Sequence, residues 1–430
     1  MRVCYVLLLS AIAAPGFAME PPSRPGVDAP ELARPGPFAV GVRTVALVQT
    51  AQADVRAYDP TSASAPPRDR NLVVDIWYPA RRSPHGAPET YRGALPSEPP
   101  APPAAFTIPG IAVRGAPPAP GRFPLVVVSH GYSNVTIALS WLTENLASKG
   151  YVVAAIRHED PPITDTKLFA EPWLRRPLDI AYVSASLQSS LAAEGRVDAT
   201  RTALIGYSMG GYGVLTSAGA TLDPAGGVAQ LVPGGLLLRY ARNGADRDAV
   251  RVRNLKAVVA ISPAGGALGA WGRDGLKDVS VPLMLIAGDC DRTVDYATGA
   301  RAFFDAASET RRYLLTFKGA GHALGLDPVP DAMRERLWNL DWFEDPVWRK
   351  DRIIAINLHM ITAFLDRYVK EDAGRAAYLD GLVPESAAGQ WAPGTGGSYE
   401  AYSPGSDSIT VWKGFQRRHA EGLELRSAGP

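Results

Sequence analysis

Residues 206–210 read Gly-Tyr-Ser-Met-Gly and constrain the fold more than any other stretch of the chain. The motif G-x-S-x-G follows an apolar run at residues 202–205 and opens a stretch of small residues at 210–220. A serine on a sharp turn between a strand and a helix has a strained backbone, so the residues two places before and after it must be small. Glycine meets this need because it lacks a Cβ. The pattern therefore predicts a strand, a tight turn that carries Ser208, and a helix.

Strand-like and helix-like segments alternate along the rest of the chain, which favours an α/β fold. We expect a mostly parallel central sheet with helices on both faces. The expected strands are residues 38–48, 72–78, 123–129, 152–156, 202–205, 256–261, 282–287 and 312–317, of which the first two form an antiparallel pair. The expected helices are residues 139–149, 178–193, 296–307 and 353–369. Residues 79–122 are dense in proline and alanine, and we expect them to form a surface excursion.

Composition sets the size of the core and excludes some partners. The chain has 430 residues, of which 46% are hydrophobic and 20% charged, so it is long enough for a large globular core. A net charge of +1 gives no reason to expect a nucleic-acid partner or a polybasic membrane anchor. The sequence leaves the oligomeric state open.

The first residues have the pattern of a secretory signal. Arg2 is a positive start, residues 3–14 are an apolar stretch too short to span a bilayer, and residues 16–18 read Gly-Phe-Ala. We expect cleavage after Ala18 and a secreted or periplasmic protein. Cys290 is then the single remaining cysteine, so no intramolecular disulfide is expected. No other segment is long and apolar enough to predict a transmembrane helix.

The boundaries that follow are a proline-rich linker at residues 19–37, a main domain at 38–372 and an extension at 373–430. The extension is rich in Gly, Pro and Ser, with a strand-like segment at 408–412.

Two insertions interrupt the alternating pattern. Residues 223–254 carry five arginines, and we favour a solvated helical face over part of a cap above the site. Residues 327–350 are rich in aromatic side chains, which predicts either satellite core or the wall of a pocket for an apolar substrate. These aromatic residues are Trp338, Trp342, Phe343 and Trp348.

A serine hydroxyl is a poor nucleophile at neutral pH unless a histidine takes its proton and an acid orients that histidine. Three histidines follow Ser208 in the chain. His322 lies in a glycine-rich loop just after the expected strand at 312–317, where an exposed base belongs. His359 falls inside an expected helix, and His419 lies among charged residues of the tail. We therefore predict Ser208 as the nucleophile and His322 as its base.

The acid is expected between Ser208 and His322, just after the strand at 282–287. Asp289 and Asp291 both follow that strand. We favour Asp291, because the turn must carry the carboxylate beyond the strand tip towards the histidine, and Asp289 then caps the turn. Cys290 is a packing residue in this interpretation, since two anionic neighbours disfavour its thiolate.

Acyl transfer also needs hydrogen-bond donors for the developing oxyanion. The backbone N–H of Met209 is one candidate. The loop after residues 123–129 supplies the other, and Gly131 allows a close backbone approach, so we choose the N–H of Tyr132. The Tyr132 ring is also expected to form a wall of the acyl pocket, and His130 to hold the loop through a hydrogen bond.

A metal site is not expected. Residues 158–160 read His-Glu-Asp, but consecutive side chains do not converge easily on one ion, and the chain has no H-E-x-x-H motif or Cys/His cluster.

Taken together, these segments resemble α/β-hydrolases of the dienelactone hydrolase and platelet-activating factor acetylhydrolase type. The matching pieces are residues 74–79 (Val-Asp-Ile-Trp-Tyr-Pro), 123–131 (Phe-Pro-Leu-Val-Val-Val-Ser-His-Gly), 146–158 (Leu-Ala-Ser-Lys-Gly-Tyr-Val-Val-Ala-Ala-Ile-Arg-His) and 206–211 (Gly-Tyr-Ser-Met-Gly-Gly). The resemblance covers residues 38–370. The serine turn together with Tyr132 also looks like that of bacterial cutinase-like and polyester-cleaving hydrolases.

The resemblance implies an α/β-hydrolase fold and hydrolysis of a small-molecule or polymeric ester without a cofactor. The two insertions are candidates for a partial cap on that fold. By position, Ser208 is the nucleophile, His322 the base, and Tyr132 and Met209 the oxyanion donors. Trp271 would complete an aromatic clamp on an apolar or aryl group, with Trp338 and Trp342 as further substrate contacts.

The chain departs from the two families at two places. Dienelactone hydrolases use a cysteine nucleophile where this chain has Ser208. The acetylhydrolases take their acid after the strand that matches residues 256–261, where this chain reads Ser-Pro-Ala, so the acid falls to Asp291. An amidase or peptidase on the same three residues and a non-catalytic binding module remain as alternatives to an esterase.

Overall fold

The computed structural model describes residues 21–22, 24–82, 86–95, 101–161, 168–334, 340, 343–390, 410–416 and 418–430. The expected signal at residues 1–18, together with Trp338 and Trp342, lies outside the described residues. Within these ranges, none of the helices has the length and apolar character needed to span a bilayer.

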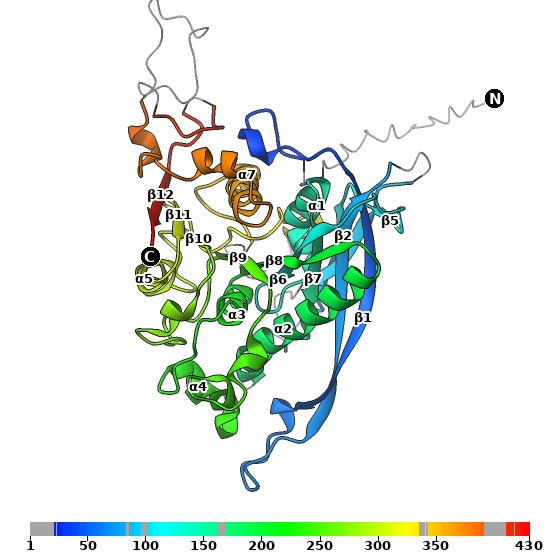
Figure 1. Ribbon diagram of the computed structural model, residues 1–430, viewed down its shortest axis with the longest axis vertical. Coiled ribbons are helices and arrows are strands. Elements are labelled where there is room, and N and C mark those ends of the chain that lie inside the picture. The colour runs from blue at the N-terminus through cyan, green and yellow to red at the C-terminus, as the bar shows by residue number, and fades with distance from the viewer. Residues whose placement is uncertain are drawn as a thin grey trace, which may run out of the picture.

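A sheet of ten strands forms the centre of the molecule, in the order β12-β11-β10-β9-β8-β6-β7-β2-β1-β5 (Figure 1). The strands are β1 (Ala39–Ala53), β2 (Pro67–Ala80), β5 (Val113–Arg114), β6 (Phe123–Ser129), β7 (Val152–Arg157), β8 (Val197–Tyr207), β9 (Leu255–Ile261), β10 (Leu283–Gly288), β11 (Arg312–Phe317) and β12 (Leu423–Ala428). The six strands from β7 to β11 in this order are parallel. β2 is antiparallel to both β1 and β7, and β12 is antiparallel to β11. The predicted α/β fold with a mostly parallel sheet is confirmed.

Helices cover both faces of this sheet. One hydrophobic cluster joins the sheet to α1 (Ser140–Ser148) and α7 (Lys350–Tyr368), and the other joins its opposite face to α2 (Ala170–Ala193), α3 (Met209–Ser217) and α5 (Ala302–Ala306). Alternate residues of the central strands enter the two clusters, as the pleat of a strand requires. Val126 and Val128 of β6 face α1, whereas Leu125 and Val127 face α2.

Helix α2 begins at Ala170, eight residues before the predicted start, and continues through Pro177. A proline inside a helix cannot donate to the carbonyl four residues earlier, here that of Trp173. The Tyr212 hydroxyl of α3 donates to this carbonyl at 2.8 Å. A neighbouring helix therefore supplies the hydrogen bond that Pro177 cannot, and the predicted helix start at residue 178 was wrong.

The expected surface excursion at residues 79–122 instead contains a buried hairpin, β3 (Thr90–Leu95) with β4 (Ala104–Pro109). Tyr91 is 3% exposed, and its hydroxyl donates to Glu144 of α1 at 2.6 Å while accepting from Trp77 Nε1 at 2.7 Å. The hairpin is buried on one face because alternate residues of each strand point inwards and join the hydrophobic cluster that contains α1 and one face of the main sheet.

The segment expected as a C-terminal extension contributes the edge strand β12 to the main sheet. Residues 410–412 of the strand-like segment are not a strand, and residues 408–409 lie outside the described residues. Trp412 and Phe415 are instead buried against α7, in the cluster that also holds Leu423 and Leu425 of β12. The described part of the extension therefore packs as part of the main domain.

The end of the expected linker is also built into the fold, at the short 3-10 helix η1 (Glu31–Ala33) beside α7 (Figure 1). The backbone N–H of Leu32 donates to His359 Nδ1 at 3.1 Å, and the ammonium of Lys149 donates to the Leu32 carbonyl at 2.5 Å. Asn145 Nδ2 donates to the Ala33 carbonyl at 2.9 Å. The side chains of His359, in α7, and of Lys149, directly after α1, thus hold both polar groups of Leu32.

This anchor predicts a pH dependence of stability. Burial, with the nearby charge of Lys149, lowers the pKa of His359 to about 3, whereas an unfolded histidine titrates near 6.5. As the pH falls from 6.5 towards 3, the unfolded chain takes up a proton here that the folded chain does not. This difference removes about 1.4 kcal/mol of stability per pH unit.

We expect His359→Asn to flatten that dependence, because an amide oxygen still accepts from Leu32 but does not titrate. Urea unfolding at several pH values between 7 and 4 measures the slope of stability against pH for both proteins. Equal slopes would contradict this account of His359.

Candidate active site

Ser208 lies on the tight turn between β8 and α3, with φ 54° and ψ −115°. A Cβ on Gly206 would lie 2.2 Å from the carbonyl oxygen of Gly210, and a Cβ on Gly210 would lie 2.0 Å from that of Ser129. Both distances are far below a van der Waals contact, so neither position has space for a side chain. The predicted strand, turn and helix around the motif are confirmed.

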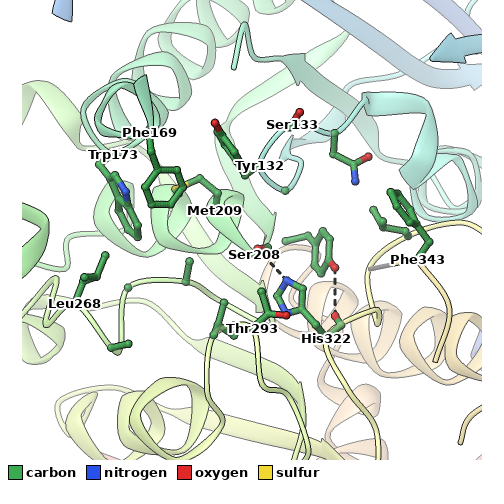
Figure 2. Close-up of a pocket in the computed structure, with 18 residues that line it drawn as sticks. Tyr132, Ser133, Phe169, Trp173, Ser208, Met209, Leu268, Thr293, His322 and Phe343 are labelled. Atoms are coloured by element: carbon green, nitrogen blue, oxygen red, sulfur yellow. Dashed lines mark hydrogen bonds between the residues drawn. The ribbon is translucent and has the colours of Figure 1, made fainter. Parts of the chain in front are cut away.

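Ser208, His322 and Asp291 form a hydrogen-bonded chain beyond the carboxyl ends of three strands. His322 Nε2 lies 3.0 Å from Ser208 Oγ, and His322 Nδ1 lies 2.8 Å from Asp291 Oδ2. Figure 2 shows the contact between Ser208 and His322. The Tyr207 hydroxyl donates to the His322 carbonyl at 3.2 Å. His359 is buried inside α7. Of the two candidate acids, Asp291 contacts the imidazole, whereas Asp289 accepts from the backbone N–H of Gly319 at 2.6 Å.

The environment of Asp291 keeps its carboxylate charged. Burial opposes ionisation, but the hydrogen bond and charge of His322 and the backbone N–H groups of Val294 and Thr293 lower its pKa below the usual value. Those two N–H groups lie 3.2 and 2.9 Å from Asp291 Oδ1. An ionised carboxylate at Nδ1 holds the imidazole proton on that nitrogen. The lone pair of His322 Nε2 then faces the Ser208 hydroxyl, as proton removal requires.

A cavity of about 330 Å³ opens above Ser208 (Figure 2). Its lining is mostly apolar and comprises Gly131, Tyr132, Ser133, Asn134, Phe169, Trp173, Tyr207, Ser208, Met209, Ala264, Gly265, Ala267, Leu268, Thr293, Val294, His322, Leu326 and Phe343. On one side Tyr132, Phe169 and Trp173 form a continuous aromatic wall. Successive rings meet edge to face, with centroids 5.2 and 5.8 Å apart.

The two insertions differ in their relation to this cavity. Phe343 of the segment 327–350 lines it, whereas Trp348 packs against Phe317 of β11. None of the lining residues given above comes from the arginine-rich segment 223–254. That segment therefore does not cover the described cavity.

Trp271 does not form the expected clamp. Its ring stacks on Tyr212 with centroids 5.6 Å apart, and its Nε1 donates to Thr216 at 3.1 Å. Trp271 thus packs against helix α3 and is not among the residues that line the cavity. The aromatic wall comes instead from Phe169 and Trp173, at the start of α2.

Sequence reasoning missed Phe169 and Trp173 because it placed the start of α2 after Pro177. Their spacing of four residues puts both on one face of the helix. A predicted helix that began at residue 170 would have shown these two aromatic residues side by side on one face.

His158 and Asp160 of the His-Glu-Asp sequence belong to a buried network behind the site, whereas Glu159 between them is exposed. His158 Nδ1 lies 2.8 Å from Asp179 and its Nε2 lies 2.9 Å from Ser129 Oγ, while Asp160 accepts from the backbone N–H of Ser133. Burial, followed by the charge of Arg176, lowers the pKa of His158 to about 4, so this ring is neutral at pH 7. The described residues contain no cluster of three or more His, Cys, Asp or Glu suited to a metal ion.

Comparison with known proteins adds to this geometry. The PET hydrolase-like family (PETase) matches residues 116–229. Cutinase est2 of Thermobifida alba is 26% identical over 199 residues, which cover 46% of this chain and 52% of that protein. The bis(hydroxyethyl) terephthalate hydrolase of Streptomyces coelicolor is 26% identical over 205 residues, covering 47% and 51%. These matches span about half of the length of the relatives.

Among solved structures, a ferulic acid esterase from Streptomyces cinnamoneus superimposes with a TM-score of 0.52 at 22% identity. The superposition covers 80% of this chain and 94% of that one. The chain therefore has the α/β-hydrolase fold. It is similar to PET hydrolase-like proteins over residues 116–229, which include Ser208, and to cutinases over just under half of its length.

Proposed function

We propose that this protein is a serine hydrolase of carboxylic esters, with Ser208 as nucleophile, His322 as base and Asp291 as the acid that orients the base. The observation that carries the proposal is the hydrogen-bonded chain from Asp291 through His322 to Ser208 Oγ, at the bottom of an apolar cavity. The predicted signal at residues 1–18 places the enzyme outside the cytoplasm in this proposal.

In the proposed mechanism, Ser208 Oγ attacks the ester carbonyl as His322 Nε2 takes its proton. The carbonyl oxygen becomes an oxyanion, for which the backbone N–H groups of Met209 and Tyr132 are the proposed donors. Both residues line the cavity beside Ser208. The protonated His322 then gives its proton to the leaving alcohol. Water, activated in turn by His322, releases the acid from the acyl-enzyme and restores the serine.

The cavity indicates the class of ester. Tyr132, Phe169 and Trp173 present aromatic surface, and Leu268 and Phe343 add apolar contacts. Such a wall favours a flat apolar group over a short polar one. We therefore propose an aryl or other apolar ester as substrate, either a small molecule or the end of a polymer chain. The names of the cutinase and terephthalate-ester relatives agree with this class.

Paired substrates test the proposal. The wild-type protein is expected to hydrolyse p-nitrophenyl benzoate with a higher kcat/KM than p-nitrophenyl acetate, and to cleave the matching p-nitroanilide far more slowly. Trp173→Leu should lower the benzoate-to-acetate ratio of kcat/KM by about tenfold or more, because it removes aromatic contacts made by the larger group alone. Trp271→Leu is the matched control, since that ring lies outside the cavity lining, and should leave the ratio unchanged.

Three results would contradict the proposal in different ways. Faster anilide than ester cleavage would identify an amidase. Tight binding of the esters without turnover would identify a binding module. An unchanged ratio in Trp173→Leu would leave the esterase in place but remove the aromatic wall as its substrate contact.

A further inference from the structure

The peptide between Gly131 and Tyr132 is held firmly on its carbonyl side. The Gly131 carbonyl lies 3.0 Å from Arg176 Nη2 and 2.7 Å from His130 Nδ1. His130 Nε2 accepts from the backbone N–H of His158 at 3.2 Å, so the ring proton lies on Nδ1 and is donated to the Gly131 carbonyl. Two donors thus converge on one oxygen.

Arg176 holds more of the same loop. Its side chain is fully buried, and Nη1 donates to the His130 carbonyl at 2.5 Å and to Ser129 Oγ at 3.2 Å. Its Nη2 also pairs with Asp160, and the same Asp160 oxygen accepts from the backbone N–H of Ser133 at 2.9 Å. The Arg176–Asp160 pair therefore contacts the loop on both sides of the Gly131–Tyr132 peptide.

Because the peptide is planar, the orientation of the Gly131 carbonyl also sets the direction of the Tyr132 N–H. In a planar trans peptide the C=O and the following N–H point to opposite sides. The Gly131 oxygen points to the buried guanidinium on α2, which is not part of the cavity lining, so the Tyr132 N–H points the opposite way, towards the cavity. A Cβ on Gly131 would lie 3.5 Å from the Cβ of Ser208, which shows how near this backbone comes to the nucleophile.

We propose that Arg176, paired with Asp160, is a positioning residue that aims the Tyr132 N–H at the oxyanion formed on a substrate bound to Ser208. This inference rests on the proposed esterase function. Arg176 itself does not touch the substrate; it acts by preventing rotation of one peptide. A donor fixed in advance stabilises the charge of the transition state at no cost of reorganisation during the reaction.

The test compares Arg176→Lys with Arg175→Lys. A lysine at 176 carries its three N–H donors on one nitrogen, so it cannot span the carbonyls of His130 and Gly131 together with Asp160 as the two Nη atoms of arginine do. Arg175 is the adjacent residue of α2, is also buried, and contacts Gln52 and the Ala53 carbonyl of β1 instead of the loop. Both variants remove a buried guanidinium from the same helix, so they differ chiefly in the loss of the loop contacts.

Two readouts separate positioning from a general structural effect. The first is the split between kcat and KM for p-nitrophenyl benzoate. The second is the affinity for an aryl trifluoromethyl ketone, which Ser208 converts to a tetrahedral oxyanion that resembles the transition state. For Arg176→Lys we expect kcat to fall about 10- to 100-fold with KM changed less than about threefold. The affinity for the ketone should fall by the same factor as kcat.

Arg175→Lys should lower thermal stability without changing kcat or ketone affinity. If Arg176→Lys does not fold, Asp160→Asn is the test, because it weakens the Arg176–Asp160 pair. We then expect smaller losses, with kcat and ketone affinity falling by the same factor. Wild-type kcat and ketone affinity in Arg176→Lys, or equal losses in Arg175→Lys, would overturn the positioning role and leave the esterase proposal intact. Absence of ester turnover by the wild-type protein would overturn both.

Discussion

Ser208→Ala is expected to lower kcat for p-nitrophenyl benzoate by at least about 10⁴-fold while the fold survives. In serine hydrolases the loss of the nucleophile costs about 10⁶-fold in kcat, and what remains comes from binding and from the oxyanion donors. The substitution removes one oxygen that contacts His322 and adds no atom to the tight turn. Initial rates, with thermal unfolding followed by circular dichroism, measure the two effects separately.

Ser217→Ala, at the other end of helix α3, is the matched control. Its hydroxyl donates to the Pro177 carbonyl at 3.2 Å, so its loss should cost about 1 kcal/mol of stability and leave turnover near that of the wild type. Retention of more than about a tenth of the wild-type kcat by Ser208→Ala would remove Ser208 from the mechanism.

Asp291→Asn is expected to lower kcat by about 10⁴-fold, as the equivalent change does in serine proteases. The amide group can donate to His322 Nδ1, which moves the imidazole proton to Nε2 and leaves no lone pair to take the proton of Ser208. Asp289→Asn is the matched control two residues away. An amide oxygen there still accepts from the backbone N–H of Gly319, so kcat should change by less than about tenfold.

The two variants are compared by steady-state kinetics on the same ester at pH 8. A larger loss of kcat in Asp289→Asn than in Asp291→Asn would show that Asp289 is the acid.

Local sequence patterns predicted the sheet and the placing of the three candidate catalytic residues because these depend on short segments. The strands of the parallel sheet are apolar runs bounded by polar or glycine-rich turns, and a strand buried on both faces needs such a run. The turn at Ser208 needs glycine at 206 and 210, where the structure has no space for a Cβ. Asp291 and His322 each follow a strand, and parallel strands bring their carboxyl ends to one edge.

The features that sequence reasoning missed depend on contacts between distant segments. Pro177 is tolerated inside α2 because Tyr212, 35 positions later in the chain, donates to the carbonyl that the proline leaves free. Tyr91 can be buried because its hydroxyl donates to Glu144 and accepts from Trp77, two residues far from it in the chain or on another strand. No local pattern reports either arrangement.

The aromatic residues show the same limit for the cavity. Trp173 precedes the Ser208 turn in the chain and Trp271 follows it, and both are buried. Trp271 stacks on Tyr212 of α3, whereas Trp173 lines the cavity. Which of them faces a substrate depends on how α2 and the loop after β9 pack on α3. Arg176 is a further case, since its partners lie about 16 to 47 positions away and its role follows from the direction of one peptide.

The most direct test of the central claim is covalent labelling of the nucleophile by an aryl fluorophosphonate, followed by intact mass measurement and peptide mapping. The account predicts one adduct per chain, located on Ser208, with ester turnover lost in step with labelling and with no adduct in Ser208→Ala. An adduct on another residue, or ester turnover that persists in a fully labelled protein, would contradict it.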